Sequence, residues 1–149
     1  MIVYGNVPVG EGNLSKVLKN RGFFVLSSDK IDRGYGAEFD FLKNDLGVAV
    51  DMDILTNPPY KYALDFVKHA LNILANNYYA IFFLKIQFLE GKERYNFFKE
   101  NPPKYVYVHS ERQKCALNND FENVKSSVVC YAWYIWQKGW KGETIIRWI

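Results

Sequence analysis

The feature that most constrains the fold is a regular alternation of short apolar segments with segments of helical periodicity. Apolar runs at residues 2–4, 23–26, 53–56, 78–84 and 105–108 have the length and composition of buried strands. Between them, residues 13–22, 61–75 and 88–100 carry apolar side chains at helical spacing. Strands that alternate with helices predict an α/β fold with a mostly parallel central sheet and helices on both faces.

Several residues mark the expected boundaries of these elements. Asn13 is expected to cap the first helix, and Gly22 is expected to follow its last turn. The Asn-Pro-Pro at residues 101–103 is expected to stop the helix at 88–100, because proline disfavours helical backbone in the residue before it. Residues 27–38 are expected to form a loop. Residues 47–50 fit either a strand or a loop.

Two more strands are expected near the C-terminal end, at residues 128–136 and 144–148, joined by a turn around Gly139 and Gly142. We expect them to pair with each other, which would place one antiparallel C-terminal strand in the sheet. Residues 110–126 are polar and predict a long loop. The 149 residues contain no repeat and no linker, so a single domain over residues 1–149 is expected.

Composition excludes several classes of protein. A chain with 49% hydrophobic residues can bury a core without disulfides, and a net charge of +3 permits a nucleic-acid partner without requiring one. Cys115 and Cys130 form no CxxC pair, so no metal is expected. The apolar run at 78–84 is too short to span a membrane, and the N-terminus does not resemble a signal peptide. A cytoplasmic protein without a membrane partner is therefore expected.

The most informative motif is Asn57-Pro58-Pro59-Tyr60, which directly follows the strand at 53–56. Ligands of parallel α/β sheets bind at the carboxyl ends of the strands, where this motif lies. Two prolines hold a rigid turn, from which the Asn57 carboxamide oxygen and the Pro58 carbonyl can both accept from one amino group. The Tyr60 ring can stack on a flat heterocycle. The alternative is a plain rigid turn into a helix.

The two other loops at this edge carry weaker signals. Val9-Gly10-Glu11-Gly12 lies between the first strand and the first helix, where glycines let a ligand approach the backbone. Asp29 follows the second strand, where an acid can bind both hydroxyls of a ribose. A plain turn would contain the same glycines, and Asp29 fits a solvated loop equally well. Asp32 is a nearby alternative candidate for the acid that binds the ribose.

Together, the glycine turn, the acid after the second strand and the Asn-Pro-Pro-Tyr motif resemble the Rossmann-like class I S-adenosylmethionine-dependent methyltransferases that modify exocyclic amines. The resemblance is strongest to small phage-type DNA adenine N6-methyltransferases and covers nearly the whole chain. It implies S-adenosylmethionine as cofactor and catalytic roles for Asn57, Pro58, Pro59 and Tyr60. The cofactor-binding residues that it implies are Asn6, Pro8, Gly10, Gly12, Asp29, Asp40, Phe41 and Asn57.

Within that resemblance, Asp40 would take the N6 amine of the cofactor adenine and the Phe41 backbone its N1. One position departs from the family, which usually opens the glycine loop with Asp or Glu followed by Pro. Here Asn6 stands at that position and the proline is displaced to Pro8. Asn6 accepts a hydrogen bond but carries no charge, so weaker cofactor affinity is expected.

DNA is the expected partner. Tyr60 would stack on the target base and Lys85 would line the site, whereas Arg112 and Lys114 would contact phosphate. All three cations fit a solvated surface as well. We expect no separate target-recognition domain in residues 1–149. Specificity is then expected from the 110–126 loop, from a homodimer or from a recognition partner.

Two other functions stay open at the level of sequence. One is methylation of a different NH₂ acceptor: a protein glutamine, cytosine N4 or an RNA base. The other is a non-catalytic module that binds nucleic acid or a partner protein through a degenerate methyltransferase fold. A nicotinamide-dependent oxidoreductase would share the fold, but the third glycine of its fingerprint is absent and Asn57–Tyr60 has no role in it.

Overall fold

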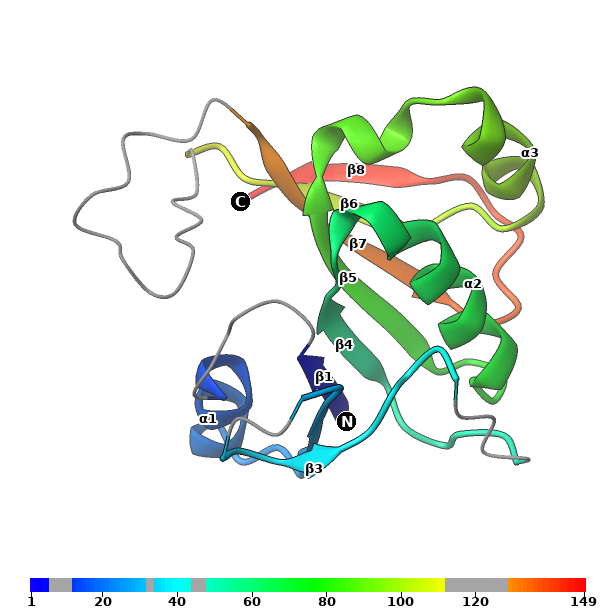
Figure 1. Cartoon of the computed structure of the whole chain (residues 1–149). Coiled ribbons are helices and arrows are strands. Elements are labelled where there is room, and N and C mark those ends of the chain that lie inside the picture. The colour runs from blue at the N-terminus through cyan, green and yellow to red at the C-terminus, as the bar shows by residue number, and fades with distance from the viewer. Residues whose placement is uncertain (6–11, 32–33, 44–47, 112–128) are drawn as a thin grey trace.

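The computed structural model describes residues 1–5, 12–31, 34–43, 48–111 and 129–149. These residues form an eight-stranded sheet flanked by helices (Figure 1). The strands are β1 (Ile2–Gly5), β2 (Leu26–Asp29), β3 (Ala37–Glu38), β4 (Ile54–Asn57), β5 (Tyr79–Lys85), β6 (Tyr105–Val108), β7 (Tyr131–Gln137) and β8 (Ile145–Trp148). The helices are α1 (Asn13–Asn20), α2 (Ala63–Ile73) and α3 (Lys92–Glu100), with 3-10 turns η1 (Tyr60–Tyr62) and η2 (Ile86–Leu89).

The strand order across the sheet is β3-β2-β1-β4-β5-β7-β6-β8. Strands β1 to β5 run parallel, β7 runs antiparallel between β5 and β6, and β8 runs parallel to β6. The predicted α/β class with a mostly parallel sheet is therefore confirmed. The chain passes from β1 outward in both directions, so β1 and β4 flank the switch point at which such sheets bind ligands.

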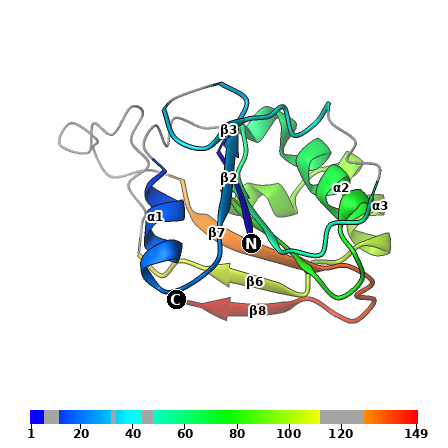
Figure 2. The same cartoon turned by 90° about the horizontal axis from the view of Figure 1, so that it is seen from below.

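Helices cover both faces of the sheet, as predicted. Figure 2 shows α1 on one side and α2 and α3 on the other. The α2 side holds the larger core, in which alternate residues of β5 (Ala80, Phe82 and Leu84) are buried beneath α2. The α1 side holds a smaller core, in which Val25 and Leu55 pack against Leu14 and Leu18.

The helical periodicity of residues 61–75 predicted α2 correctly. Its buried residues lie at the spacing of a single helix face: Ala63, Phe66, Val67, Ala70, Leu71 and Ile73. The helix expected at 88–100 begins later, as α3, because η2 and Gly91 precede it. It ends as predicted, where the Asn101 N–H donates to the Phe97 carbonyl and the two prolines follow.

The sequence misplaced the start of the second strand and the first helix cap. β2 starts at Leu26, not at residue 23, and the Phe23 and Phe24 side chains are 52% and 71% exposed. The Phe23 N–H donates back to the Leu18 carbonyl, so this segment still belongs to the end of α1. At the other end, Gly12 occupies the cap in a left-handed conformation, and Asn13 is the first helical residue.

One predicted loop and one predicted strand pairing were also wrong. Ala37–Glu38 forms β3 within the expected loop at 27–38, because it pairs with Ser28 and Asp29. The last two strands do not pair with each other. The Lys104 N–H donates to the Ile135 carbonyl of β7, and the Lys104 carbonyl accepts from the Ile145 N–H of β8, so β6 lies between them. The antiparallel strand is β7 and not the final strand.

Two remaining segments are only partly described. Within residues 47–50, Val50 forms an isolated bridge to Leu74, and residue 47 lies outside the described residues. Most of the expected 110–126 loop, residues 112–126, lies outside them as well.

Phe66→Ala is expected to lower the free energy of unfolding by about 3–5 kcal/mol. Phe66 is 1% exposed, and its ring stacks on Phe41 with 5.2 Å between centroids. Chemical denaturation followed by circular dichroism measures the change. Tyr95→Ala is the control, because the Tyr95 side chain is 62% exposed, and it should cost less than about 0.5 kcal/mol. Equal costs for the two variants would contradict this core.

Candidate functional site

The carboxyl ends of three strands lie level at the switch point of the sheet. Gly5, the last residue of β1, pairs with Asp29 of β2 on one side and with Asn57 of β4 on the other. This register brings two predicted site residues, far apart in the sequence, to either side of one strand end. Asn6, Pro8 and Gly10 follow β1 directly and lie outside the described residues.

Asn57 presents an acceptor atom at this edge. Its Oδ1 atom is buried and has no hydrogen-bond partner among the described residues. A buried acceptor without a partner costs about 1–3 kcal/mol, so folding alone gives no reason to keep one here. The carboxamide oxygen is therefore available to a donor that is not part of the described chain.

The proline corner behind Asn57 is built into the core. Pro58 is fully buried, and the Pro59 carbonyl accepts from the Tyr62 N–H at 2.9 Å, which closes η1. α2 follows at once and packs its apolar face on the sheet. The corner is thus held between β4 and α2. It places Tyr60 at the surface, where the Tyr60 side chain is 40% exposed.

Lys85 contacts Tyr60 from the neighbouring strand. Its ammonium group lies 4.5 Å from the centroid of the Tyr60 ring, a cation–π contact. Lys85 is the last residue of β5, and the Tyr134 hydroxyl donates to the Lys85 and Ile86 carbonyls at 3.1 and 3.2 Å. Burial raises the pKa of Tyr134 well above its ordinary value, so the hydroxyl stays a donor. The end of β5 is thereby fixed beside Tyr60.

Aromatic rings that sequence reasoning missed form a wall beside Tyr60. The Tyr60 and Tyr131 ring centroids lie 6.1 Å apart, and Tyr131 stacks on Phe83 at 5.2 Å. Leu55 pairs with Ile81, so Asn57 and Phe83, two residues further along, lie on the same face of the sheet. Tyr131 reaches this place because β7 pairs with β5 at Lys85. Only the tertiary pairing could have revealed it.

The two predicted acids lie near each other but have different partners. The Asp29 carboxylate accepts from the Ile31 N–H at 3.1 Å, and the Asp29 carbonyl accepts from the Phe39 N–H at 2.7 Å. The second bond brings the segment that carries Asp40 alongside β2. The Asp40 carboxylate forms ion pairs with Lys30 and Lys43, at 3.2 and 3.9 Å.

Phe41 and Gly12 both have structural roles that the sequence did not reveal. The Phe41 side chain is 3% exposed and packs between Phe66 and His69, so its ring belongs to the core. At Gly12 a side chain would collide with Tyr35, because a Cβ atom there would lie 2.2 Å from the ring. The packing of Tyr35 therefore requires glycine at position 12, independently of any ligand.

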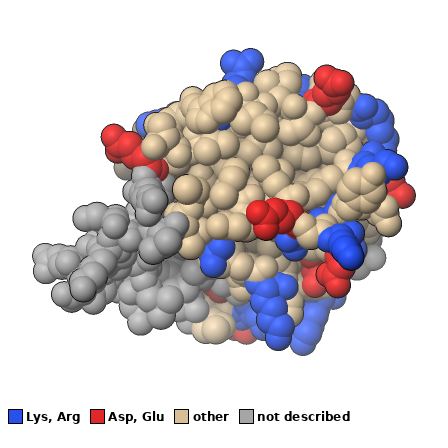
Figure 3. Space-filling model, turned by 90° about the horizontal axis from the view of Figure 1, so that it is seen from above, with Lys and Arg blue, Asp and Glu red and all other residues tan. Residues whose placement is uncertain are grey.

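Of the cations expected to contact nucleic acid, Lys85 lies at the site. Arg112 and Lys114 lie outside the described residues. Figure 3 shows the face seen from above, where Lys and Arg side chains are interspersed with Asp and Glu and do not gather into one continuous stripe.

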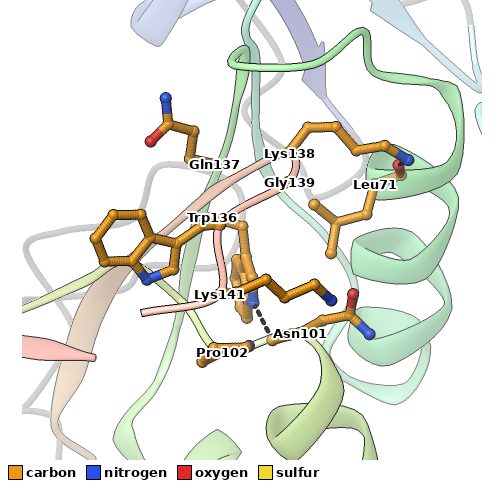
Figure 4. Close-up of a pocket in the computed structure, with 9 residues that line it drawn as sticks. Leu71, Asn101, Pro102, Trp136, Gln137, Lys138, Gly139 and Lys141 are labelled. Carbon is orange, nitrogen blue, oxygen red and sulfur yellow. Dashed lines mark hydrogen bonds between the residues drawn. The ribbon is translucent and has the colours of Figure 1, made fainter. Parts of the chain in front are cut away.

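A separate pocket lies at the opposite end of the sheet. It has a volume of about 190 Å³, and Leu71, Asn101, Trp136, Lys138 and Lys141 are among its lining residues (Figure 4). The two lysines donate to the Leu71 and Glu100 carbonyls in the last turns of α2 and α3, where cations favour the helix dipole. The second Asn-Pro-Pro therefore lies in a structural region, at the amino end of β6, as its reading as a helix stop predicted.

Within the part of the chain that the structure describes, no group of three or more His, Cys, Asp or Glu residues is arranged to hold a metal ion. No helix in that part has the length and apolar character needed to cross a bilayer.

No family model matches the sequence, and no curated protein matches it. Solved structures do match. A protein described as a class I S-adenosylmethionine-dependent methyltransferase from Listeria monocytogenes superposes with a TM-score of 0.62 at 11% identity, over 99% of this chain and 58% of its own. A predicted O-methyltransferase from Agrobacterium tumefaciens gives 0.64 at 11%, over 98% and 78%. The M protein of the type I restriction enzyme EcoKI gives 0.58 at 11%, over 93% and 40%.

This chain thus spans 58% of the length of the Listeria protein and 40% of that of the M protein. At 11% identity these similarities concern the fold. The strand order, with β7 reversed between β5 and β6, the helices on both faces and the superposed structures agree on one conclusion: this chain has the class I S-adenosylmethionine-dependent methyltransferase fold.

Proposed function

We propose that this protein is an S-adenosylmethionine-dependent methyltransferase that acts on an exocyclic amine, N6 of adenine in DNA. The observation that carries the proposal is the buried, unpartnered Oδ1 atom of Asn57, at the end of β4 and ahead of a clamped proline corner. An amine donor at that place would satisfy it. Tyr60, exposed beside it, offers a ring on which a flat base can stack.

The residues along the strand ends fit the cofactor. Asp29 lies level with Gly5, where a carboxylate can bind the two ribose hydroxyls. Asp40 and the Phe41 backbone, brought alongside by the bond from Phe39 to Asp29, would hold the adenine. The loop from Asn6 to Gly12 would hold the methionine end. Bound S-adenosylmethionine supplies a methyl group already activated by its sulfonium.

The protein then has to hold and align the acceptor. Asn57 Oδ1 and the Pro58 carbonyl would accept the two hydrogens of the amine, which favours a tetrahedral nitrogen and stabilises its developing positive charge. Stacking on Tyr60 would direct the lone pair along the S–CH₃ bond. With the cofactor held by these residues, the amine nitrogen would take the methyl group as the S–C bond breaks, and the surplus proton would leave to water. In duplex DNA the base would first rotate out of the helix.

Similar folds in two restriction systems favour DNA as substrate. Besides the EcoKI M protein, the type IIG restriction endonuclease BpuSI superposes on 94% of this chain with a TM-score of 0.60. An RNA base is the alternative acceptor, because a structure described as an RNA methyltransferase from Pyrococcus horikoshii superposes on 91% of the chain with a TM-score of 0.53. Transfer from labelled cofactor to DNA and to RNA, followed by nucleoside analysis, separates the two. Labelled N6-methyladenosine from RNA, with no label in DNA, would overturn the DNA assignment.

Asn57→Ala is expected to lower the methylation rate by about 10²–10³-fold, because one of two acceptors for the amine is lost. Its affinity for S-adenosylmethionine in calorimetry should stay within a few-fold of wild type. The matched control is Asn101→Ala, in the second Asn-Pro-Pro, which should keep full activity because that segment lies at the amino end of β6. Full activity of Asn57→Ala would remove the assigned role.

Asp29→Ala is expected to weaken S-adenosylmethionine binding by about 10- to 100-fold, because a charged acceptor for the ribose is lost. Calorimetry measures the dissociation constant. Asp51→Ala is the control, since Asp51 is an exposed acid just before the amino end of β4. Equal affinities for wild type and Asp29→Ala would place the ribose elsewhere. The absence of any cofactor binding to wild type would instead favour the non-catalytic module.

Tyr60→Phe is expected to keep activity, whereas Tyr60→Ala is expected to raise the KM for DNA about 10-fold, because stacking needs only a ring. Steady-state kinetics at saturating cofactor measures both. A Tyr60→Phe variant as impaired as Tyr60→Ala would show that the hydroxyl, and not the ring, has the essential role.

A further inference from the structure

The outer strand β8 presents an open and apolar edge. Figure 2 shows it as the last strand of the sheet, and among the described residues it pairs only with β6. All four of its residues are exposed, and Ile145, Ile146 and Trp148 are 41%, 49% and 72% exposed. Ile149, next in the chain, is 52% exposed. Such an edge is a template on which another strand can pair.

The backbone of β8 offers that strand a defined set of hydrogen bonds. The Ile145 and Ile149 N–H groups donate to carbonyls of Lys104 and Val108, toward β6. Because these groups alternate in direction along a strand, those of Ile146 and Trp148 point to the open edge, and those of Thr144 would do so where an added strand extends the pairing. An added strand must therefore place its own inward-pointing groups opposite positions 144, 146 and 148.

We propose that the added strand is β8 of a second copy, paired antiparallel about a two-fold axis to form a homodimer with one continuous sheet. The axis passes at Ile145, so that Ile145 lies opposite Ile145 of the partner subunit. Thr144 then forms a hydrogen-bonded pair with Ile146 of the partner subunit. In this register, the backbone N–H and C=O groups that pair across the axis are those that point to the open edge of β8.

One charge in β8 and one just before it select this register and this partner. Glu143 and Arg147 lie two residues before and two residues after Ile145, so in this register Glu143 lies opposite Arg147 of the partner subunit. The symmetry gives two such pairs, both at non-hydrogen-bonded positions, where side chains approach most closely. Within the described residues, neither Glu143 nor Arg147 has an ion-pair partner in the monomer; the Arg147 guanidinium lies 5.9 Å from the Tyr105 ring.

Other registers lack this match. A shift of the axis to Ile146 would set Arg147 opposite Ile145 of the partner subunit and Glu143 opposite the partner's Ile149, which leaves all four charges unpaired. Two identical antiparallel strands form two ion pairs when an acid and a base lie at equal distances on either side of the residue on the two-fold axis. A foreign strand would have no reason to meet this internal symmetry.

Sedimentation velocity on the full chain, over about 1 to 200 µM, tests the proposal, because a small strand-edge interface is expected to dissociate in the micromolar range. Wild type should shift from monomer to dimer over this range. Arg147→Glu should weaken dimerisation at least about 10-fold by placing like charges opposite each other, and the double variant Glu143→Arg, Arg147→Glu should restore it. Lys68→Glu, the same change of charge on an exposed position of α2, should leave dimerisation unchanged.

A second variant does not depend on charge. Ile146→Pro removes an N–H that points to the open edge, so it should block dimerisation and leave the pairing with β6 in place. Circular dichroism verifies that each variant is folded. A wild type that stays monomeric at about 200 µM, or that binds another protein's strand but not itself, would overturn the proposal. So would a dimer that persists in Arg147→Glu or one that the double variant fails to restore.

Discussion

The structure depends on the double pairing of β1, which binds β2 along one edge and β4 along the other in parallel register. This arrangement places the ends of three strands at one level and turns the chain outward in both directions from the centre. Asp29 at the end of β2 and Asn57 at the end of β4 then lie on either side of Gly5, although they are far apart in the sequence. The residues of β4, buried on both faces, and the alternate buried residues of β5 hold this register, since a slip by one residue would turn Ile54 and Phe82 away from the larger core.

Much of this arrangement could be predicted from the sequence, because it rests on local patterns. The periodicity of α2, the apolar run of β5 and the proline stop after α3 all come from adjacent residues, and each was placed to within a few positions. β2 was misplaced, because Phe23 and Phe24 are apolar yet exposed, and only the packing of the end of α1 decides where the strand begins. The pairing of β8 with β6 was missed because the proximity of β7 and β8 in the sequence favoured a hairpin. The tertiary order of the sheet instead places β6 between them.

The candidate site also has residues that could be predicted from the sequence and residues that could not. Asn57 and its proline corner were recognisable as a motif, and Asp29 was recognisable by its place after a strand. The rings of Tyr131 and Phe83 carry no such signal, because aromatic residues in strands are usually core. Gly12 shows a further limit of motif reasoning. Its lack of a side chain is required by the ring of Tyr35, a residue distant in sequence and absent from any glycine pattern.

The reversal of β7 has a consequence for how the domain is encoded. The strand that carries Tyr131 is the seventh in the chain, yet it is inserted between the fifth and the sixth. The first 108 residues alone would therefore contain Asn57 and Tyr60 but would leave β5 and β6 separated by the width of a missing strand. The ring beside Tyr60 would be missing as well. During synthesis the sheet cannot close until residue 137 has emerged, so the proline corner acquires its full surroundings only after β7 has been made.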